Sequence, residues 1–354
     1  RFQVADRQRG LCRLAAEQAL AVQNTLGPND ICLYVGIPFC PTRCAYCSFV
    51  SHAVDKAGHL LPPFLAALAR EMEAVGRLVS SLGLRPVSVY IGGGTPTTLS
   101  PPQLDDMLAA LARHFDLSAL REYTVEAGRP DTVSADKLDV LARRGGTRVS
   151  VNPQSMQDAV LAAAGRPHTA QDVLDAFALA RGAGLAVNMD LIAGLPGDTP
   201  DGFRNSLERV LALRPENVTI HTLAHKRGSR LTLEGMPVCP PTQVEAMLGD
   251  GYDRLDGAGY GCYYLYRQKY MAGQFENTGW AKPGCENLYN VCMMEELRTV
   301  LALGGGGVSK VIDFTHMRVE RVFNPKYPYE YLDRLDEVIA RKKNLYEMLK
   351  IANK

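Results

Sequence analysis

One stretch of the chain decides its fold, the run Tyr34-Val35-Gly36-Ile37-Pro38-Phe39-Cys40-Pro41-Thr42-Arg43-Cys44-Ala45-Tyr46-Cys47. The cysteines in this run follow a C-x3-C-x2-C spacing. Three thiolates on one short loop can bind three irons of a 4Fe-4S cube and leave the fourth iron without a protein ligand. An open iron can chelate a small molecule through an amine and a carboxylate. The spacing therefore predicts a cluster at Cys40, Cys44 and Cys47 that takes part in chemistry, with Tyr46 shielding it from water.

Two other kinds of cysteine site fit this stretch less well. A structural zinc ion needs four ligands in a closed tetrahedron, and the nearest further candidate, His52, lies at a spacing unlike that of paired zinc knuckles. A disulfide framework is not expected from nine cysteines spread thinly over 354 residues. The remaining cysteines show no comparable spacing, so we expect them to be ordinary core or surface residues.

The composition is that of a globular protein with a large core. The chain is 46% hydrophobic and 22% charged, and its formal net charge of +1 gives no sign of nucleic-acid binding. It contains no apolar run of 18 residues and no signal peptide, so we expect neither a membrane span nor export. Reduced thiols and an oxygen-sensitive cluster suit the cytoplasm. The chain starts at Arg1, and we expect a natural N-terminus upstream of it.

Apolar segments of strand character alternate with segments of helical periodicity along the first two thirds of the chain. We expect strands over residues 31–37, 87–91, 122–127, 148–151, 186–192 and 217–222. The helices between them are expected over residues 62–82, 100–114, 134–144, 169–183 and 199–213. This alternation predicts an α/β fold, a partial (β/α)6 barrel open on one side, whose chemistry lies at the carboxyl ends of the strands.

Motifs downstream of the cysteines carry a more specific signal. They are Gly92-Gly93-Gly94-Thr95-Pro96-Thr97, Glu126, Gln154, Arg166, Asp190 within Asn188-Met189-Asp190-Leu191-Ile192-Ala193-Gly194-Leu195-Pro196-Gly197, and Ala224-His225. Together with the cysteine run, this ordered series resembles the radical S-adenosylmethionine (SAM) superfamily. Within that superfamily it resembles the oxygen-independent coproporphyrinogen III oxidase/dehydrogenase family. The resemblance extends from Ile31 to Ser309.

The resemblance divides the chain into three parts. Residues 1–30 are expected to be an N-terminal extension, 31–224 the radical SAM barrel, and 225–354 a mainly helical C-terminal region. In the last part we expect helices over 240–258 and 329–349, and a flexible glycine loop over 303–309. The aromatic and basic stretch 261–270 is equally consistent with a cover for a tetrapyrrole face and with a core tyrosine cluster.

Two features of the strand ends have a direct physical role. Glycines at 92–94 directly follow a strand and let the backbone approach the amino group of a SAM molecule closely. A plain glycine turn is the alternative. Glu126 ends the next strand, where a carboxylate can accept hydrogen bonds from the two ribose hydroxyls. A solvated strand-end acid is the alternative for Glu126.

The resemblance implies that each chain binds one or two SAM molecules. The first would be held by Tyr34, Gly93, Glu126 and Val311. A second, beside the first, would contact Tyr46, Gly94, Thr95, Gln154, Arg166, Asp190 and Ala224. Arg166 can bind a carboxylate through two parallel hydrogen bonds, and Asp190 can accept from an ammonium group or a hydroxyl. Taken singly, such residues are more commonly a surface ion and a strand-end cap, but at the family's spacing they favour a site.

The resemblance also implies the reaction. A reduced cluster would cleave SAM to a 5′-deoxyadenosyl radical, which removes hydrogen from a porphyrinogen propionate so that carbon dioxide leaves and a vinyl group remains. The expected partners are a tetrapyrrole substrate and an electron donor such as flavodoxin or ferredoxin. Cations on the top loops could bind the propionates, namely Arg43, Arg129, Lys226, Arg227 and Arg230. An ordinary solvated loop explains these cations equally well.

One departure keeps other activities open. In the best-characterised decarboxylases a further cysteine follows the third cluster cysteine two positions later, whereas here Cys47 is followed by Ser48 and Phe49. Sister families share this difference, including haem-binding chaperones, two-SAM radical methyltransferases and enzymes that open the haem ring. The run Glu126-Ala127-Gly128-Arg129-Pro130-Asp131 resembles a second group of coproporphyrinogen dehydrogenases from anaerobic bacteria. We therefore expect coproporphyrinogen III dehydrogenation, with the sister activities as alternatives.

Overall fold

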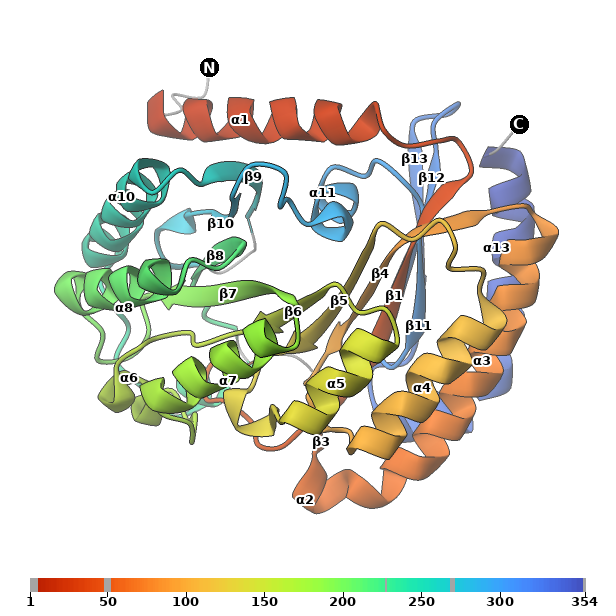
Figure 1. Cartoon of the computed structure of the whole chain (residues 1–354), viewed down its shortest axis with the longest axis horizontal. Coiled ribbons are helices and arrows are strands. Elements are labelled where there is room, and N and C mark those ends of the chain that lie inside the picture. Colours follow the sequence, from red (N-terminus) through yellow and green to blue (C-terminus); the bar gives the residue numbers. More distant parts are fainter. Residues whose placement is uncertain (1–5, 48–51, 227, 268–270, 353–354) are drawn as a thin grey trace.

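Six parallel strands form the barrel wall that the sequence predicts. The computed structural model describes residues 6–47, 52–226, 228–267 and 271–352. Within these ranges the six strands lie side by side in chain order (Figure 1). They are β1 (Asp30–Ile37), β4 (Arg85–Gly93), β5 (Glu122–Ala127), β6 (Arg148–Val151), β7 (Ala186–Ala193) and β8 (Asn217–Thr222). Most residues of these strands are buried, as is usual for parallel strands that are covered on both faces.

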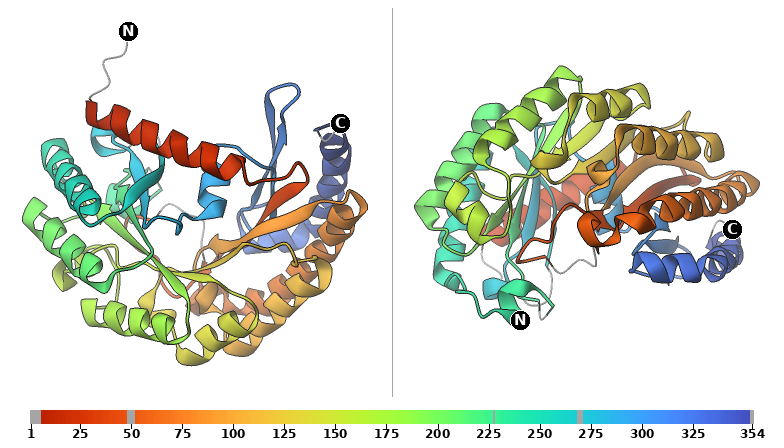
Figure 2. Two further views of the ribbon diagram at one scale, coloured as in Figure 1. Left: turned by 45° about the horizontal axis from the view of Figure 1, so that its top comes forward. Right: turned by 90° about the horizontal axis from the view of Figure 1, so that it is seen from below.

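The helices between these strands cover the outside of the barrel, and the sequence predicts each of their ends to within one residue. They are α3 (Leu61–Ser81), α4 (Pro101–His114), α5 (Ala135–Arg143), α7 (Ala170–Gly182) and α8 (Pro200–Leu213). Capping boxes begin α4 and α7, formed by Ser100 with Gln103 and by Thr169 with Asp172. Figure 2 shows these helices as an arc outside the strands.

Shorter elements complete the first two thirds of the chain. They are α2 (Val54–Ala57), α6 (Asp158–Ala163) and the strand pair β2 (Phe39–Cys40) and β3 (His52–Ala53). Helix α1 (Asp6–Gln23) lies across the strand β9 (Gly261–Tyr266) and also contacts α11 (Leu288–Met294). No helix in the ranges that the structure describes is both long and apolar enough to cross a membrane.

The C-terminal region adds strands to both edges of the barrel sheet, and the sequence did not predict them. On one edge, β10 (Asn277–Ala281) pairs antiparallel with β8, and β9 pairs antiparallel with β10. On the other edge, β11 (Val300–Gly304) pairs parallel with β1 and is followed by the hairpin of β12 (Val308–Asp313) and β13 (Arg318–Phe323). Short apolar runs such as β9 cannot be told from buried helical segments by periodicity alone. One core cluster joins residues from both sides of position 224. The division of the chain at residues 30 and 224 stays a prediction.

Helices still account for more residues of this region than strands do. They are α9 (Arg230–Leu233), α10 (Pro241–Gly257), α11, α12 (Pro328–Asp333) and α13 (Leu335–Ala352). The glycine stretch 303–309, expected to be a flexible loop, is instead the tight turn of a hairpin. Gly304 ends β11 opposite Gly36, and β12 begins at Val308. The turn therefore lies beside the end of β1, from which the cysteine run emerges.

A buried polar network ties the C-terminal helices to the barrel. Glu71 of α3 is fully buried and accepts hydrogen bonds from the backbone N–H of Gly304 (2.8 Å), Asn324 Nδ2 (2.9 Å) and Tyr331 Oη (2.6 Å). Its Oε1 also lies 3.6 Å from Nζ of the buried Lys342 in α13. Because all these groups are buried, each depends on the others for compensation of its charge or polarity. The network fixes α13, α12 and the glycine turn against α3.

Replacing Glu71 with glutamine is expected to lower the free energy of unfolding by about 3–5 kcal/mol, because it leaves the buried Lys342 ammonium without its counter-charge. The matched control is Arg70→Ala on the same helix, since Arg70 pairs with Asp336 of the same α13 but at exposed positions, with 62% and 90% of the two side chains exposed. That control should cost no more than about 1 kcal/mol. Denaturant titration measures both values, and equal losses in the two variants would contradict this account of the network.

Candidate active site

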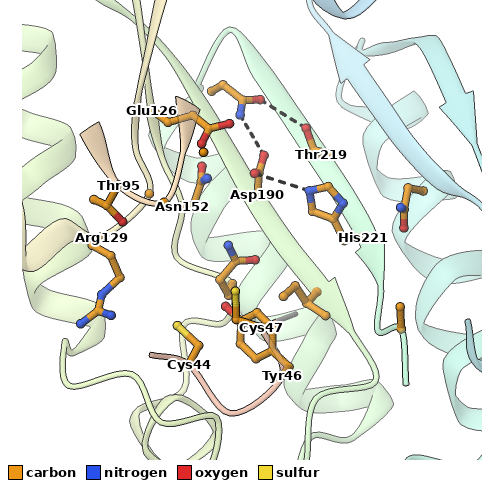
Figure 3. Close-up of a pocket in the computed structure, with 18 of the residues that line it drawn as sticks. Cys44, Tyr46, Cys47, Thr95, Glu126, Arg129, Asn152, Asp190, Thr219 and His221 are labelled. Carbon is orange, nitrogen blue, oxygen red and sulfur yellow. Dashed lines mark hydrogen bonds and ion pairs between the residues drawn. The ribbon is translucent and has the colours of Figure 1, made fainter. Parts of the chain in front are cut away.

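A cavity of about 440 Å³ opens at the carboxyl ends of the barrel strands. Its size lies within the range of about 300–1,000 Å³ that is typical of small-molecule sites. The walls come from the cysteine run 40–47, the ends of β4, β5, β7 and β8, the strand β9 and the helix α11 (Figure 3). This is the end of the barrel where the sequence places the chemistry.

The three cysteines of the run, Cys40, Cys44 and Cys47, all line the cavity and none of them is in a disulfide. Backbone bonds hold the loop against the strand ends, including Thr95 N–H to Phe39 O (2.8 Å). A side chain at Gly94 would bring its Cβ within 2.5 Å of Phe39 O and 3.0 Å of Cys40 Sγ. Glycine at this position therefore allows the cysteine loop to pack directly on the end of β4.

The donor set fits a 4Fe-4S cube better than a single metal ion. No three His, Cys, Asp or Glu side chains in the described ranges converge as ligands of one ion, which a zinc site would require. In a cube each thiolate binds a different iron, so the three sulfur atoms need only line the same wall of the cavity and need not converge on one point. The three thiols on the loop, all of which line the cavity and none of which is in a disulfide, meet that condition.

Glu126, at the end of β5, is a half-buried acid beside the glycine turn. Its Oε1 accepts a hydrogen bond from Tyr90 Oη (2.7 Å). Burial raises the pKa of Glu126 to about 7, and the nearby Asp190 adds to this effect, while the Tyr90 bond and His221 act in the opposite direction. A Cβ added at Gly92 would lie only 3.0 Å from the carboxyl carbon of Glu126. A small ligand in contact with the glycine backbone would therefore also reach this carboxyl group.

Asp190 is the centre of a polar cluster on β7 and β8. Asn188 Nδ2 donates to its Oδ1 (2.8 Å), and His221 Nε2 lies 3.5 Å from its Oδ2 (Figure 3). Thr219 Oγ1 in turn donates to Asn188 Oδ1 (3.4 Å). Sequence analysis missed Asn188, Thr219 and His221 as candidates. Their spacing could have revealed them, because residues two apart on a strand face the same side.

Two buried amide oxygens on the cavity wall have no hydrogen-bond donor among the described residues. They are Oδ1 of Asn152 and Oε1 of Gln154, whose residues are 7% and 8% exposed. Gln154 has a positive φ of 66°, and its N–H and C=O are fixed by bonds to Asp190 O and Ile192 N–H. Buried acceptors are nearly always paired. These two oxygens suit a ligand that presents an ammonium group, an amine or hydroxyls.

Arg166 was predicted to bind a carboxylate of SAM, and in the structure all its N–H groups contact protein atoms. Its Nε donates to His168 Nδ1 (3.4 Å) and its Nη2 to two backbone carbonyl oxygens. Its Nη1 donates to Tyr46 Oη (3.1 Å) and Cys44 Sγ (3.8 Å). An arginine has five N–H donors, so the protein itself uses them all. Burial lowers the pKa of His168 to about 4, with a further contribution from the Arg166 charge, and the neutral ring can accept the bond.

The cavity also receives three of the cations expected to bind substrate. Arg43 and Lys226 line it, and Arg43 Nη2 donates to Gly228 O (3.0 Å). Arg129 is 3% exposed and is held by Asp131 (3.0 Å) and by Thr42 Oγ1 (2.9 Å). Arg43 lies within the cysteine run and Lys226 follows β8, and both can reach an anionic ligand in the cavity.

The structure brings most of the predicted residues together and leaves a few outside. The cavity is lined by Cys40, Arg43, Cys44, Tyr46, Cys47, Gly93, Gly94, Thr95, Glu126, Arg129, Gln154, Arg166, Asp190, Ala224 and Lys226. Arg227 lies outside the described residues. Arg230, at the start of α9, is an exposed residue paired with Glu234 (2.9 Å) and does not line the cavity.

Tyr34 and Val311 were expected to hold the first SAM, but neither lines the cavity. The ring of Tyr34 stacks behind Tyr90 and Tyr289, with centroids 6.3 and 6.1 Å away, and those two rings form the wall instead. Val311 is 2% exposed and belongs to the core, because β11 lies between its strand β12 and the barrel strand β1.

An aromatic and sulfur-rich wall faces the cavity from the C-terminal region. Strand β9 contributes Tyr264 and Tyr266, and α11 contributes Tyr289, Asn290, Met293 and Met294. The sequence singles out the tyrosines of the stretch 261–270 but not the residues of α11. Residues at 289, 290, 293 and 294 share one helix face by their spacing, although nothing in the sequence indicates that this face meets the barrel.

Comparisons with known proteins agree with the geometry. Residues 34–210 match the Radical SAM superfamily. The chain is 38% identical over 325 residues to the "Oxygen-independent coproporphyrinogen-III oxidase-like protein HemZ" of Bacillus subtilis, covering 91% of this chain and 65% of that protein. It is 30% identical over 311 residues to the "Heme chaperone HemW" of Escherichia coli, covering 85% of this chain and 75% of that protein.

A solved structure shows the same fold. Coproporphyrinogen III oxidase (HemN) from Escherichia coli, described as a radical SAM enzyme, superposes with a TM-score of 0.70 over 90% of this chain and 72% of its own, at 24% identity. This chain spans 65% of the length of the Bacillus subtilis HemZ protein, and likewise 65% of the length of a "Heme chaperone HemW" from the same organism, to which it is 31% identical over 263 residues, or 73% of this chain. The cofactors of the superfamily are a 4Fe-4S cluster and SAM, which the cysteine loop and the glycine turn fit. The chain therefore belongs to the radical SAM superfamily, among the relatives of oxygen-independent coproporphyrinogen III oxidase.

Proposed function

We propose that this protein converts propionate side chains of coproporphyrinogen III to vinyl groups by oxidative decarboxylation. The observation that carries the proposal is the make-up of one cavity. It combines three cysteines outside any disulfide, a half-buried acid beside a glycine turn, and an aromatic wall with cations near it. A redox centre, a SAM site and room for a flat anionic substrate would then adjoin one another.

The chain's own residues would orient SAM on the glycine side of the cavity. Glu126 would accept from the ribose hydroxyls, because its carboxyl group lies beside the glycine backbone. The amide oxygens of Asn152 and Gln154 would accept hydrogen bonds from a ligand, which would give both buried oxygens a partner. When bound, the cluster and SAM supply the one-electron chemistry that removes a hydrogen atom from the substrate.

The substrate would lie against the opposite wall. The rings of Tyr264 and Tyr289 and the side chains of Met293 and Met294 offer apolar surface to a tetrapyrrole and exclude water. Arg43 and Lys226 would pair with propionates.

In the proposed reaction, removal of one hydrogen atom from the propionate β-carbon is followed by cleavage of the bond to the carboxylate. Carbon dioxide leaves, the vinyl double bond forms, and one electron passes to an external acceptor. A flavodoxin- or ferredoxin-type donor would supply the reducing electron.

A haem chaperone is the second candidate, favoured by the nature of the same wall. His221, Met293 and Met294 line the cavity, and imidazole and thioether groups are common ligands of haem iron. The similarity to two proteins named heme chaperone HemW adds to this possibility. A radical methyltransferase or haem-degrading activity would use the same cluster and SAM.

Replacing any one of Cys40, Cys44 or Cys47 with alanine is expected to abolish both the broad visible absorption of the cluster and SAM cleavage, because three thiolates are the minimum set for the cube. The control is Cys12→Ala, an exposed cysteine outside the cavity, which should leave iron content and cleavage as in the wild type. Absorption spectra, iron determination and deoxyadenosine release measure these outcomes. Cleavage of SAM by a cavity variant would refute the cluster assignment.

SAM affinity should depend on the charge of Glu126. Because its pKa is raised to about 7, the carboxyl is largely protonated below that pH and ionised above it, so affinity should increase as the pH rises through 7. Glu126→Gln should remove this dependence and weaken binding at high pH by about ten- to a hundredfold, the worth of a hydrogen bond to a charged group. Equilibrium binding to the cluster-loaded protein gives both values. Iron content should stay unchanged, and a parallel loss of iron would assign Glu126 a structural role.

The proposed reaction is tested by anaerobic incubation of the reconstituted protein with SAM, dithionite and coproporphyrinogen III, followed by mass spectrometry. We expect loss of carbon dioxide from the tetrapyrrole together with formation of deoxyadenosine. Parallel incubations use haem in place of the porphyrinogen. Stoichiometric haem binding without SAM turnover would favour the chaperone, and S-adenosylhomocysteine would favour a methyltransferase. Either outcome without decarboxylation would overturn the proposal.

A further inference from the structure

We propose that Arg166 is a positioning residue of the cluster that raises its reduction potential, through a hydrogen bond to the Cys44 sulfur and through its positive charge. This role differs from the binding of a SAM carboxylate that the sequence suggests. It depends on the cluster and on the geometry beneath the cysteine loop, and not on the identity of the substrate.

Arg166 is a buried cation without a carboxylate of its own. It is 5% exposed, and no Asp or Glu in the part of the chain that the structure describes forms an ion pair with it. The acid that acts on it at longer range, Asp131, is already paired with Arg129 at 3.0 Å. Its hydrogen-bond acceptors are two backbone carbonyls, the Tyr46 hydroxyl, a neutral imidazole and the Cys44 sulfur.

Of these acceptors, only the Cys44 sulfur can become an anion at neutral pH by binding a metal. A charge buried away from water needs an opposite charge close by. A cysteine that binds iron does so as the thiolate. The partner that compensates the Arg166 charge is therefore the cluster with its thiolates, and the Nη1 to Sγ distance of 3.8 Å places the charge in direct contact with it.

The position of the guanidinium is fixed relative to the loop. Arg166 follows α6 through the turn Ala164–Gly165, and this turn bonds to the cysteine run through Ala45 N–H to Ala164 O (3.0 Å). Gly165 has φ +71°, and a Cβ there would lie 3.3 Å from Ala45 N. The glycine thus allows the turn to pack against the loop that carries Cys44 and Tyr46, two residues that Figure 3 shows at the cavity. The hydrogen bond to sulfur is a consequence of this packing.

The electrostatic effect has a definite sign. Reduction adds a negative charge to the cluster, and a cation in contact with a ligand sulfur stabilises the reduced state more than the oxidised one. Hydrogen bonds to ligand sulfurs and the charge around a cluster are the levers by which proteins set its potential. Arg166 therefore makes the cluster easier to reduce.

The test is a redox titration of the cluster in the reconstituted full chain without SAM, followed by electron paramagnetic resonance, for wild type, Arg166→Gln and Arg166→Lys. Arg166→Gln should shift the midpoint potential to a more negative value, and Arg166→Lys should shift it less because the charge remains. The matched control is Arg129→Gln, which removes a buried cation on the same cavity but has no contact with a sulfur, so its shift should be smaller.

Because SAM is omitted, a role in carboxylate binding alone would leave the potential of Arg166→Gln unchanged, and that result would overturn the proposal. A shift equal to that of Arg129→Gln would also overturn it, since the sulfur contact would then add nothing. If Arg166→Gln fails to load iron but Arg166→Lys loads it, the requirement for a cation supports the proposal. If both folded variants fail to load iron, Arg166 acts by holding the loop and the proposal is wrong.

Discussion

The site depends on how closely the cysteine loop packs against the end of the barrel. A side chain at Gly94 would collide with Phe39 O and crowd Cys40 Sγ, so the loop can lie on β4 only because this position is glycine. From the other side, the Ala164–Gly165 turn supports the same loop through Ala45. Between these two contacts the thiols face the cavity. Gly94 follows β4, and the Ala164–Gly165 turn comes after β6 in the chain. The strand order of the barrel brings these two segments to the same end of the sheet, where both contact the cysteine loop.

The molecule contains several charged side chains that are buried or half-buried, and they differ in which opposite charges and hydrogen-bond partners surround them. Glu71 meets Lys342 and three neutral donors, and this network has a structural role at the outer face of β11. Glu126 accepts from the Tyr90 hydroxyl and the Gly93 backbone but has no close cation that outweighs its burial, and its raised pKa reflects that incomplete compensation. Arg166 has no acid of its own among the described residues. The groups with incomplete compensation are those that line the cavity, as is usual where a bound ligand completes the set of contacts.

The C-terminal region builds the half of the cavity that the barrel lacks. Strand β9 and helix α11 carry tyrosines and methionines of one wall, whereas the barrel strands and the loops that follow them carry the acids, amides and cysteines of the other. Helix α11 is held in place from below, because Glu122 of β5 accepts from the backbone N–H groups of Leu288 (2.8 Å) and Tyr289 (3.2 Å) at its start. Glu122 and Glu126 thus lie on one strand, one fixing the wall and the other facing the ligand space.

The sequence predicted the barrel well because its signals are local. Helix caps such as Ser100 and Thr169, and apolar strands between them, mark each βα unit without knowledge of the rest of the fold. Residues that the motifs name directly, such as Cys44, Glu126 and Asp190, were found for the same reason. Val311 and Tyr34 do not line the cavity, and their surroundings depend on how strands distant in sequence stack beside β1, so their predicted contact with SAM stays a prediction. The bonds of Arg166 and the wall from α11 likewise arise from long-range packing that no spacing reveals.

The central claim is that three cysteines hold a cluster whose remaining iron is open to SAM in this cavity. Electron–nuclear double resonance on the reduced, reconstituted protein tests it most directly, using SAM isotopically labelled at its amino nitrogen and carboxylate oxygens. The account predicts hyperfine coupling from both labels, as expected when the amine and the carboxylate bind the open iron. A reduced cluster that shows no coupling to either label when SAM is bound would contradict it.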